Sequence, residues 1–244
     1  MPVELFNIEK GYYVFSKGNY ETEKHAHYAI EIVCCTSGSF NITTGLSEYT
    51  NLKSVIIPSN LPHSFSCINA ECNLLFLDPL SDIGIYFLQQ YNLASQKSVI
   101  VNSAGLDQFH NKGAFDIALM LDKAKTNSTG QTDFRISACI ETVNALVADQ
   151  KLTVSQLAKA SFLSGSRLAH LFKKQLGISV HQYILWKKIL LAVLKSREGY
   201  SLTECAHYVG FSDSSHFNKV FYKMFGVTPF FGLKDQQVYG EGNK

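Results

Sequence analysis

The stretch from residue 201 to residue 229, SLTECAHYVGFSDSSHFNKVFYKMFGVTP, constrains the fold of this chain more than any other. Its first part predicts a short helix that ends at about residue 209, with one face formed by Leu202, Cys205, Ala206 and Val209. Gly210 favours the left-handed backbone that ends such a helix. Ser212 or Asp213 can then cap the N-terminus of a second helix.

The second helix is predicted from about Ser214 to Phe225. Its apolar residues recur at the spacing of one helical face and predict a buried stripe of Phe217, Val220, Phe221 and Met224. Small polar and basic residues remain for the outer face. A short helix, a glycine turn and such a second helix predict a helix-turn-helix. The alternative is an ordinary helical hairpin with an aromatic core, which leaves the rest of the chain unexplained.

A second helix-turn-helix is predicted upstream, from residue 151 onward. Thr153 can cap a short helix that reaches Ala158, and a longer helix is predicted from about Ser164 to Leu176. Between the two units, residues 180–195 predict one long apolar helix. A helix of about 16 residues spans ~24 Å, so the two recognition helices can lie ~34 Å apart, one turn of B-DNA. One chain can then enter two successive major grooves.

The charge of the chain is divided between its two parts. Residues 151–244 contain 13 Lys and Arg against 5 Asp and Glu, a net charge of +8. Residues 1–150 contain 9 against 15, a net charge of −6, and the whole chain has +2. A basic C-terminal part is typical of nucleic-acid binding, because Lys and Arg release counterions from phosphate. A solvated basic surface is the less specific alternative.

Ordered positions near the C-terminus resemble the signature of AraC-type transcription regulators. The matching residues are Ala206, Val209-Gly210-Phe211-Ser212-Asp213, Ser215, Phe217, Val220-Phe221, Phe225-Gly226 and Thr228-Pro229. The resemblance covers residues 150 to 229 strongly. It implies a sequence-specific transcription regulator that binds double-stranded DNA, forms a homodimer and responds to a small-molecule effector. RNA polymerase is a further candidate partner.

The outward residues of the two recognition helices are the candidate DNA-binding side chains. They are Ser166, Arg167, Ala169, His170, Lys173, Lys174, Ser214, Ser215, His216, Asn218, Lys219 and Lys223. Several are short, which favours readout through thymine methyl groups or DNA shape. Three positions depart from the family pattern: Lys188 replaces a usual arginine, Gly232-Leu233 replaces an aromatic-Arg ending, and Gly165 weakens its helix by about 1 kcal/mol relative to alanine.

The N-terminal part predicts an antiparallel β-barrel or sandwich. Short β-rich runs, GYYVFS, YAIEIVCCTSG, SFNITTG, SVIIPS and CNLLFLD, alternate with turn residues up to about residue 77. Within them, the spacing of His25, His27, Glu31, Gly38 and His63 resembles the cupin motif, with Asn60 where a glycine is usual. We expect the histidines and Glu31 to lie on a strand and to point into the barrel.

These polar residues allow two interpretations. His25, His27, Glu31 and His63 can line a pocket for a small effector, as the family resemblance implies, with no metal and no other cofactor. Alternatively they can bind a divalent metal ion, because imidazole and carboxylate are good ligands for first-row ions. The barrel would then be a cupin metalloenzyme or a metal sensor fused to a DNA-binding domain. We favour the effector pocket, because a cupin-like fold does not by itself imply the metal chemistry of cupin enzymes.

Helical periodicity replaces the strand pattern after about residue 79. Residues 83–91, 115–124 and 134–147 predict three amphipathic helices, and residues 126–132 predict a polar linker. The resemblance assigns dimerisation to these helices, and packing against the barrel is an equal alternative. The predicted fold is α+β: a cupin-like sensory barrel at 1–80, a helical dimerisation region at 81–149 and an all-α DNA-binding domain at 150–244.

Other features of the sequence exclude competing classes of protein. No apolar run of eighteen residues and no secretory signal is present, so we expect a cytoplasmic protein. The six cysteines show no zinc-finger spacing, and we interpret them as small buried hydrophobic residues. Nucleophile elbows, phosphate loops and paired carboxylates are absent, which argues against an enzyme. A protein-interaction module of helical hairpins does not account for the basic segment.

Overall fold

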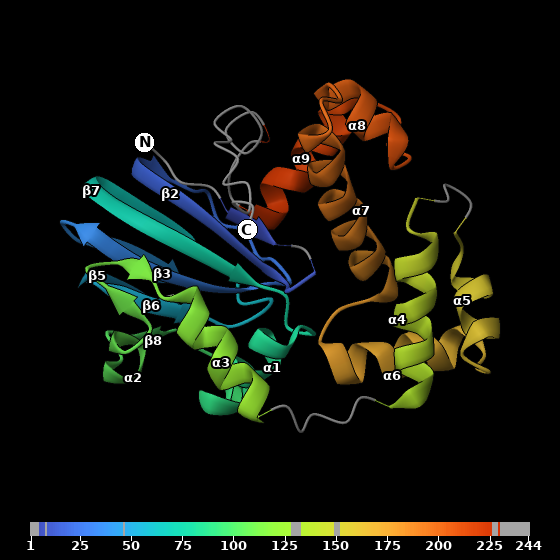
Figure 1. Ribbon diagram of the computed structural model, residues 1–244, viewed down its shortest axis with the longest axis horizontal. Coiled ribbons are helices and arrows are strands. Elements are labelled where there is room, and N and C mark those ends of the chain that lie inside the picture. The colour runs from blue at the N-terminus through green and yellow to red at the C-terminus, as the bar shows by residue number, and fades with distance from the viewer. Residues whose placement is uncertain are drawn as a thin grey trace, which may run out of the picture. The chain divides into compact units, whose positions relative to one another are not determined.

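The computed structural model describes residues 5–7, 9–45, 47–127, 133–148, 152–225 and 229. Its contacts divide the described chain into two compact units (Figure 1). The barrel unit contains residues 5–127, and the helical unit contains residues 133–225. Each unit has its own buried core.

The barrel unit is built on one antiparallel sheet. Its strands are β1 (Leu5–Asn7), β2 (Tyr12–Glu21), β3 (Ile30–Ser37), β4 (Phe40–Thr44), β5 (Ser47–Leu52), β6 (Ser54–Ile57), β7 (Ser64–Leu77) and β8 (Ile100–Val101). They pair in the order β1-β2-β7-β3-β6-β8, and β4 joins β5 to β7. Because β7 pairs with β4 near its start and with β3 further on, the sheet curls into a nearly closed barrel. The predicted antiparallel barrel is confirmed.

Strand alternation divides the core of this unit between two faces of the sheet. On β3, Ile30, Ile32 and Cys34 are buried together with Leu75 and Leu77 of β7 beneath the helices. The helices are α1 (Asp82–Gln90), η1 (Leu93–Ser95), α2 (Ala104–Asp107) and α3 (Ile117–Asn127). Figure 1 shows α1 and α3 against the sheet. Alternation turns the intervening residues of β3 toward the barrel interior.

The apolar stripes of α1 and α3 are used for packing on the sheet. Ile83 and Phe87 of α1 and Met120 of α3 are fully buried in the core that the helices share with the strands. A small hairpin of β9 (His110–Asn111) and β10 (Ala114–Phe115) leads into α3. Packing against the barrel therefore accounts for these two stripes.

The helical unit begins with α4 (Phe134–Leu146), which contacts the helices that follow it. The other helices are α5 (Val154–Ala160), α6 (Gly165–Leu176), α7 (Val180–Arg197), α8 (Leu202–Tyr208) and α9 (Ser214–Phe225). Figure 1 shows α8 and α9 at one end of α7 and α6 at the other. Tyr183 of α7 packs on Phe172 of α6 at 5.5 Å between ring centroids, and Trp186 packs on Phe225 of α9 at 5.3 Å. The long helix thus supports both pairs of helices.

Local sequence signals explain where these helices begin. Thr153, Ser179 and Ser201 each form a capping box with the residue three positions later, at the starts of α5, α7 and α8. Ser164 caps α6, and Asp213 accepts a hydrogen bond of 2.7 Å from the backbone N–H of His216 in α9. Short polar residues at these positions satisfy N–H groups that a helix leaves unpaired.

The two turns between paired helices have the same geometry but different residues. Phe162 and Gly210 both have left-handed backbones, with φ of 55° and 81°, and each donates its N–H to the carbonyl three residues earlier. The following residue, Leu163 or Phe211, donates to the carbonyl five residues earlier in both turns. Phe162 is 88% exposed, so its ring contributes little burial at a position that favours glycine.

This difference predicts that Phe162→Gly stabilises the protein. A left-handed backbone costs roughly 1–2 kcal/mol for a residue with a Cβ, and glycine avoids it at some cost in chain entropy. We expect the free energy of unfolding to rise by about 0.5 to 1 kcal/mol, measured by urea denaturation. Phe162→Ala is the matched control, because it removes the ring but keeps the Cβ. Equal stability of the two variants would show that the backbone is unstrained.

Candidate functional site

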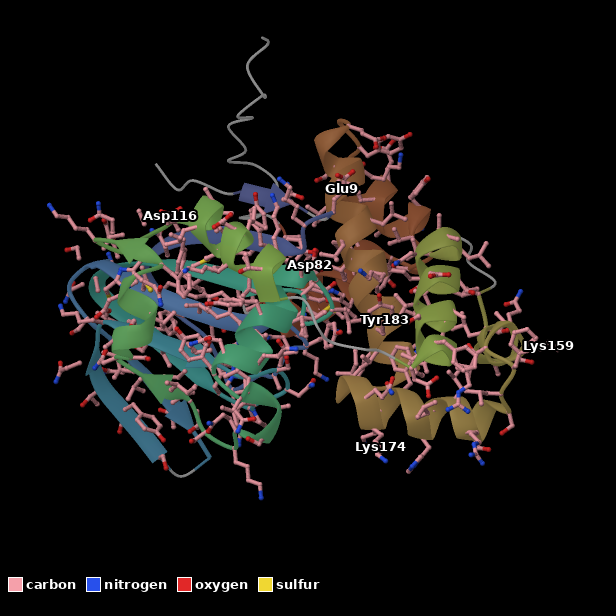
Figure 2. All side chains as sticks on the ribbon, turned by 60° about the horizontal axis from the view of Figure 1, so that its bottom comes forward. Glu9, Asp82, Asp116, Lys159, Lys174 and Tyr183 are labelled. Carbon is pink, nitrogen blue, oxygen red and sulfur yellow. The ribbon has the colours of Figure 1, made fainter. Side chains whose placement is uncertain are left out.

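The recognition surface of the first helix-turn-helix (α5 and α6) lies on α6. Leu168 and Phe172 are fully buried on its inner face. All of the predicted DNA-binding residues of this helix are exposed: Ser166, Arg167, Ala169, His170, Lys173 and Lys174. Figure 2 shows Lys174 projecting away from α6, whereas Tyr183 lies among the helices. Gly165 is the first residue of α6, directly after the cap, where it interrupts no helical turn.

The second helix-turn-helix (α8 and α9) presents a narrower surface. Phe217, Phe221 and Phe225 form the fully buried stripe of α9, whereas Val220 and Met224 are only partly buried. The predicted stripe was therefore wrong in two members, because the inner face is centred one residue further along. The exposed residues of α9 are Ser215, His216, Lys219 and Lys223.

The shift of the inner face affects two of the predicted contacts. Ser214 and Asn218 are partly buried, and the Asn218 Oδ1 atom is shielded from solvent without a hydrogen-bond partner among the described residues. Ser215 and Lys219, by contrast, are exposed on the outer face. Helical periodicity alone did not resolve this shift, because five of the twelve residues of α9 have aromatic rings when His216 is included.

The basic side chains on both surfaces are available to an anionic partner. Among the described residues, Arg167, Lys173, Lys174, Lys219 and Lys223 form no ion pair. Neither α6 nor α9 contains an acidic residue. A cation with no internal partner can contact phosphate without first breaking a salt bridge. Lys188, which differs from the family pattern, is partly buried in α7. Gly232 and Leu233, which also differ from it, lie outside the described residues.

A second candidate site, the His/Glu cluster, is formed by His25, His27, Glu31 and His63. Glu31 lies on β3, but His25 and His27 precede that strand and His63 precedes β7. The expectation that His25 and His27 lie on a strand with Glu31 was wrong. His25 and His63 instead form an isolated bridge, with both backbone N···O distances 2.9 Å, which draws two connections together. The three histidines and Glu31 lie close together as predicted, but the pairing of two connecting segments brings them together.

Asn60, the departure from the cupin-like motif, fits its position. It has a left-handed backbone with φ of 61°, a conformation that asparagine tolerates better than most residues. Its N–H donates to the His27 carbonyl at 2.7 Å. Asparagine therefore replaces glycine here and still closes the connection that carries the cluster.

The hydrogen bonds of the cluster fix the orientation of each imidazole. Each Nδ1 atom lies 2.8 to 2.9 Å from a backbone carbonyl, which can only accept, so each Nδ1 carries a proton. Each of the three histidines places one ring nitrogen within 4.8 Å of the other two. His27 Nε2 lies 3.0 Å and His63 Nε2 3.2 Å from Glu31 Oε2, the latter as an ion-pair contact without hydrogen-bond geometry.

The electrostatics of the cluster follow from burial and charge. Burial opposes ionisation of Glu31, but the contacts with His27 and His63 outweigh it and hold the pKa of Glu31 well below its usual range. Burial also opposes charge on His63, but the contact with Glu31 and its charge together raise the pKa of His63. Burial, with the charges of His63 and His27, lowers the pKa of His25 to about 4. Glu31 is thus held as a buried carboxylate beside His27 and His63.

The cluster meets the geometric requirement of a metal site. Ligating histidines commonly donate the second ring N–H to a backbone carbonyl, which leaves Nε2 for the metal. With Nδ1 protonated, His27 and His63 can donate to Glu31 only as imidazolium ions. A divalent cation at this point would replace the Nε2 protons, with the three histidines as ligands and Glu31 beside them. Among the described residues, the three histidines are the group with this arrangement.

Comparisons with known proteins find similarity in the helical unit. Residues 157–230 match the family described as a helix-turn-helix domain. The chain is 37% identical over 81 residues to the probable transcriptional regulator LumQ of Photobacterium leiognathi, over 33% of each chain. It is 33% identical over 102 residues to the arabinose operon regulatory protein of Escherichia coli, over 40% of this chain and 34% of that one. The resemblance to AraC-type transcription regulators is confirmed.

The chain spans about a third of the length of these curated relatives. Its whole fold is similar to a solved structure, ToxT of Vibrio cholerae bound to a naphthalenyl-butenoic acid. The TM-score is 0.58 at 14% identity, over 92% of this chain and 99% of ToxT. The arrangement of a barrel followed by helix-turn-helix units is thus a known fold. Across the part of the chain that the structure describes, no helix is long and apolar enough to cross a bilayer.

Proposed function

We propose that this chain is a sequence-specific DNA-binding transcription regulator. The observation that carries the proposal is the pair of helix-turn-helix units on α7, each with an exposed basic surface that has no ion pair among the described residues. The net charge of +8 on residues 151–244 supports binding to phosphate. We assign DNA binding to residues 150–244, sensing to residues 1–80 and dimer contacts to residues 81–149.

Selection of bound fragments from random or genomic DNA tests this function. We expect the full chain to enrich a motif with two half-sites about 10 bp apart, because α6 and α9 enter successive major grooves. Affinity should fall steeply with salt, as it does for proteins that bind through phosphate contacts. Failure to enrich any sequence at low salt, with or without cell extract, would contradict the proposal.

The barrel is the proposed site of effector control. Its interior carries the buried polar atoms of the His/Glu cluster, which can orient a small ligand with an acidic or hydroxyl group. Two solved structures of ToxT are described with carboxylic acids bound, one of them an unsaturated fatty acid. An effector shifts a regulator between states only if it binds one state more tightly. The DNA selection with cell extract also tests this dependence.

The remaining assignments follow from the same proposal. A homodimer would form through the helices of residues 81–149, and α4 is the best candidate because Phe134 is 74% exposed on it. RNA polymerase is a candidate partner of the DNA-bound protein. We assign the chain no catalytic activity and place it in the cytoplasm, where regulators reach DNA.

Metal binding in the barrel is the second candidate function. It is favoured by His25, His27 and His63, which each place one ring nitrogen within 4.8 Å of the other two. A divalent ion would supply positive charge and an electrophilic centre there, and these histidines would hold and orient it. The protein would then be a metal sensor or a metalloenzyme with a DNA-binding domain.

Metal analysis of the purified full chain separates the two candidates. If the cluster is an effector pocket, we expect well under one metal per chain, and chelation should leave DNA binding unchanged. Stoichiometric metal that is lost in His27→Gln and His63→Gln would favour the second candidate. His110→Gln is the matched control, because this histidine lies outside the cluster.

A further inference from the structure

Three cysteines of the barrel unit form a second cluster that neither DNA binding nor the His/Glu cluster uses. Cys72 Sγ lies 3.2 Å from Cys35 Sγ and also 3.2 Å from Cys67 Sγ. Cys35 and Cys72 are direct partners in the antiparallel pairing of β3 with β7, and Cys67 lies five residues earlier on β7. All three thiols are free. We call Cys35, Cys67 and Cys72 the cysteine cluster.

Cys72 is the shared member of the cluster, because its sulfur lies beside both of the others. Directly opposed residues of antiparallel strands have Cα atoms ~4.5 to 5.5 Å apart, inside the range that a disulfide spans. The strand pairing therefore suits a disulfide between Cys35 and Cys72, and for Cys67 the Sγ distance of 3.2 Å places its sulfur within reach of Cys72.

The three thiols differ in access to solvent. Cys67 and Cys72 are buried, with 0% and 1% exposure, whereas Cys35 is partly exposed near the end of β3. Cys35 also has the more favourable charge environment. A hydrogen bond with Cys72 is the main cause that lowers the pKa of both Cys35 and Cys67. The charge of Lys53 lowers the pKa of Cys35 further, whereas the charges of Cys35 and Glu71 oppose ionisation of Cys67. A reagent from solvent therefore meets Cys35 first.

We propose that the cysteine cluster is a thiol oxidation site at which a hydroperoxide reacts with Cys35 and Cys72 resolves the product as a disulfide. The Cys35 thiolate attacks one peroxide oxygen, the O–O bond breaks, and an alcohol or water leaves after protonation. This oxidises Cys35 to a sulfenic acid. The Cys72 sulfur then attacks Cys35, the S–O bond breaks, and water leaves. Two thiols have lost two electrons and the peroxide has been reduced.

The position of Cys67 adds a second step. Its thiolate can attack Cys72, break the Cys35–Cys72 bond and release Cys35 as a thiolate. The disulfide then lies between two buried residues of β7, and the exposed thiol is regenerated. This exchange needs no further oxidant, because one disulfide replaces another. The cluster differs in this respect from a simple exposed pair of cysteines.

The test uses the full chain, hydrogen peroxide as the probe, and differential alkylation with peptide mapping. We expect the native protein to lose two thiols, with Cys72 linked to Cys35 or Cys67. Cys139 and Cys205, which are buried in the helical unit, are the internal control and should stay reduced. Loss of the Cys72 thiol no faster than that of Cys139, or oxidised Cys35 without any disulfide at Cys72, would overturn the proposal.

Variants separate the two steps. Cys72→Ser should stop the reaction at the Cys35 sulfenic acid, which dimedone traps, and Cys35→Ser should slow peroxide consumption at least tenfold. Cys67→Ser should still form the Cys35–Cys72 bond. Cys139→Ser is the matched control and should react like the native chain. If Cys72→Ser does not fold, mapping of the native protein still decides between the outcomes, because it needs no variant.

Discussion

Replacing Glu31 with glutamine is expected to lower the free energy of unfolding by about 3 to 5 kcal/mol, because it removes one partner from a buried charge network. Glu31 is 3% exposed and contacts Nε2 of both His27 and His63. Glutamine keeps the shape but leaves the buried imidazolium charge of His63 without a counter-charge. Urea denaturation measures the loss. Glu48→Gln, on exposed strand β5, is the matched control and should change stability by less than about 0.5 kcal/mol.

The pH dependence of this loss has a defined sign. The pKa of Glu31 is depressed, so its contribution is present above its ordinary value of 4.5 and fades as the pH falls toward the depressed pKa. The pKa of His63 is raised, so its contribution is present below 6.5 and fades as the pH rises through the raised pKa. The difference between native chain and Glu31→Gln should therefore be largest between pH 4.5 and 6.5. A difference that is small and flat with pH would show that the pair carries no charge.

Phe221→Ala is expected to unfold α9 and abolish DNA binding at the second helix-turn-helix. Phe221 is fully buried between Phe217 and Phe225, at 6.0 and 4.8 Å between ring centroids. Removing such a ring leaves a cavity that costs roughly 3 to 5 kcal/mol. Thermal unfolding followed by circular dichroism measures the effect.

Lys223→Ala provides the control on the same helix. Lys223 is exposed, so its loss should change stability by less than about 0.5 kcal/mol. It should weaken binding to all DNA sequences alike and lower the salt slope by about one, because the side chain contacts phosphate. Normal stability of Phe221→Ala would mean that the aromatic stripe does not hold α9 in place.

The helices of the helical unit were largely predictable because their signals are local. Thr153 and Asp213 cap helices as predicted, and Gly177 and Gly210 end helices with left-handed backbones. The strands β2, β3, β6 and the later part of β7 were predictable from continuous apolar runs. The polar edge strand β5 was not, because it pairs with β4 alone and most of its residues are exposed.

Features that depend on distant parts of the chain were predicted less well. The cysteine cluster requires the register of β3 on β7, and a shift by one residue would move Cys35 to the other face. The convergence of the histidines requires the pairing of two connections rather than a strand. The rotation of α9, which places Phe225 inside and Met224 near the surface, depends on contact with Trp186 of α7.

The most direct test of the two-groove account is base preference measured on single-base variants of the selected DNA site. The double variant Ser215→Ala with Lys219→Ala removes two exposed polar side chains from α9. The double variant Arg167→Ala with His170→Ala does the same on α6. Each good base contact contributes about 1 to 3 kcal/mol of discrimination. The account predicts that each folded double variant loses preference in one half-site and keeps it in the other. Unchanged base preferences in both folded variants would contradict it.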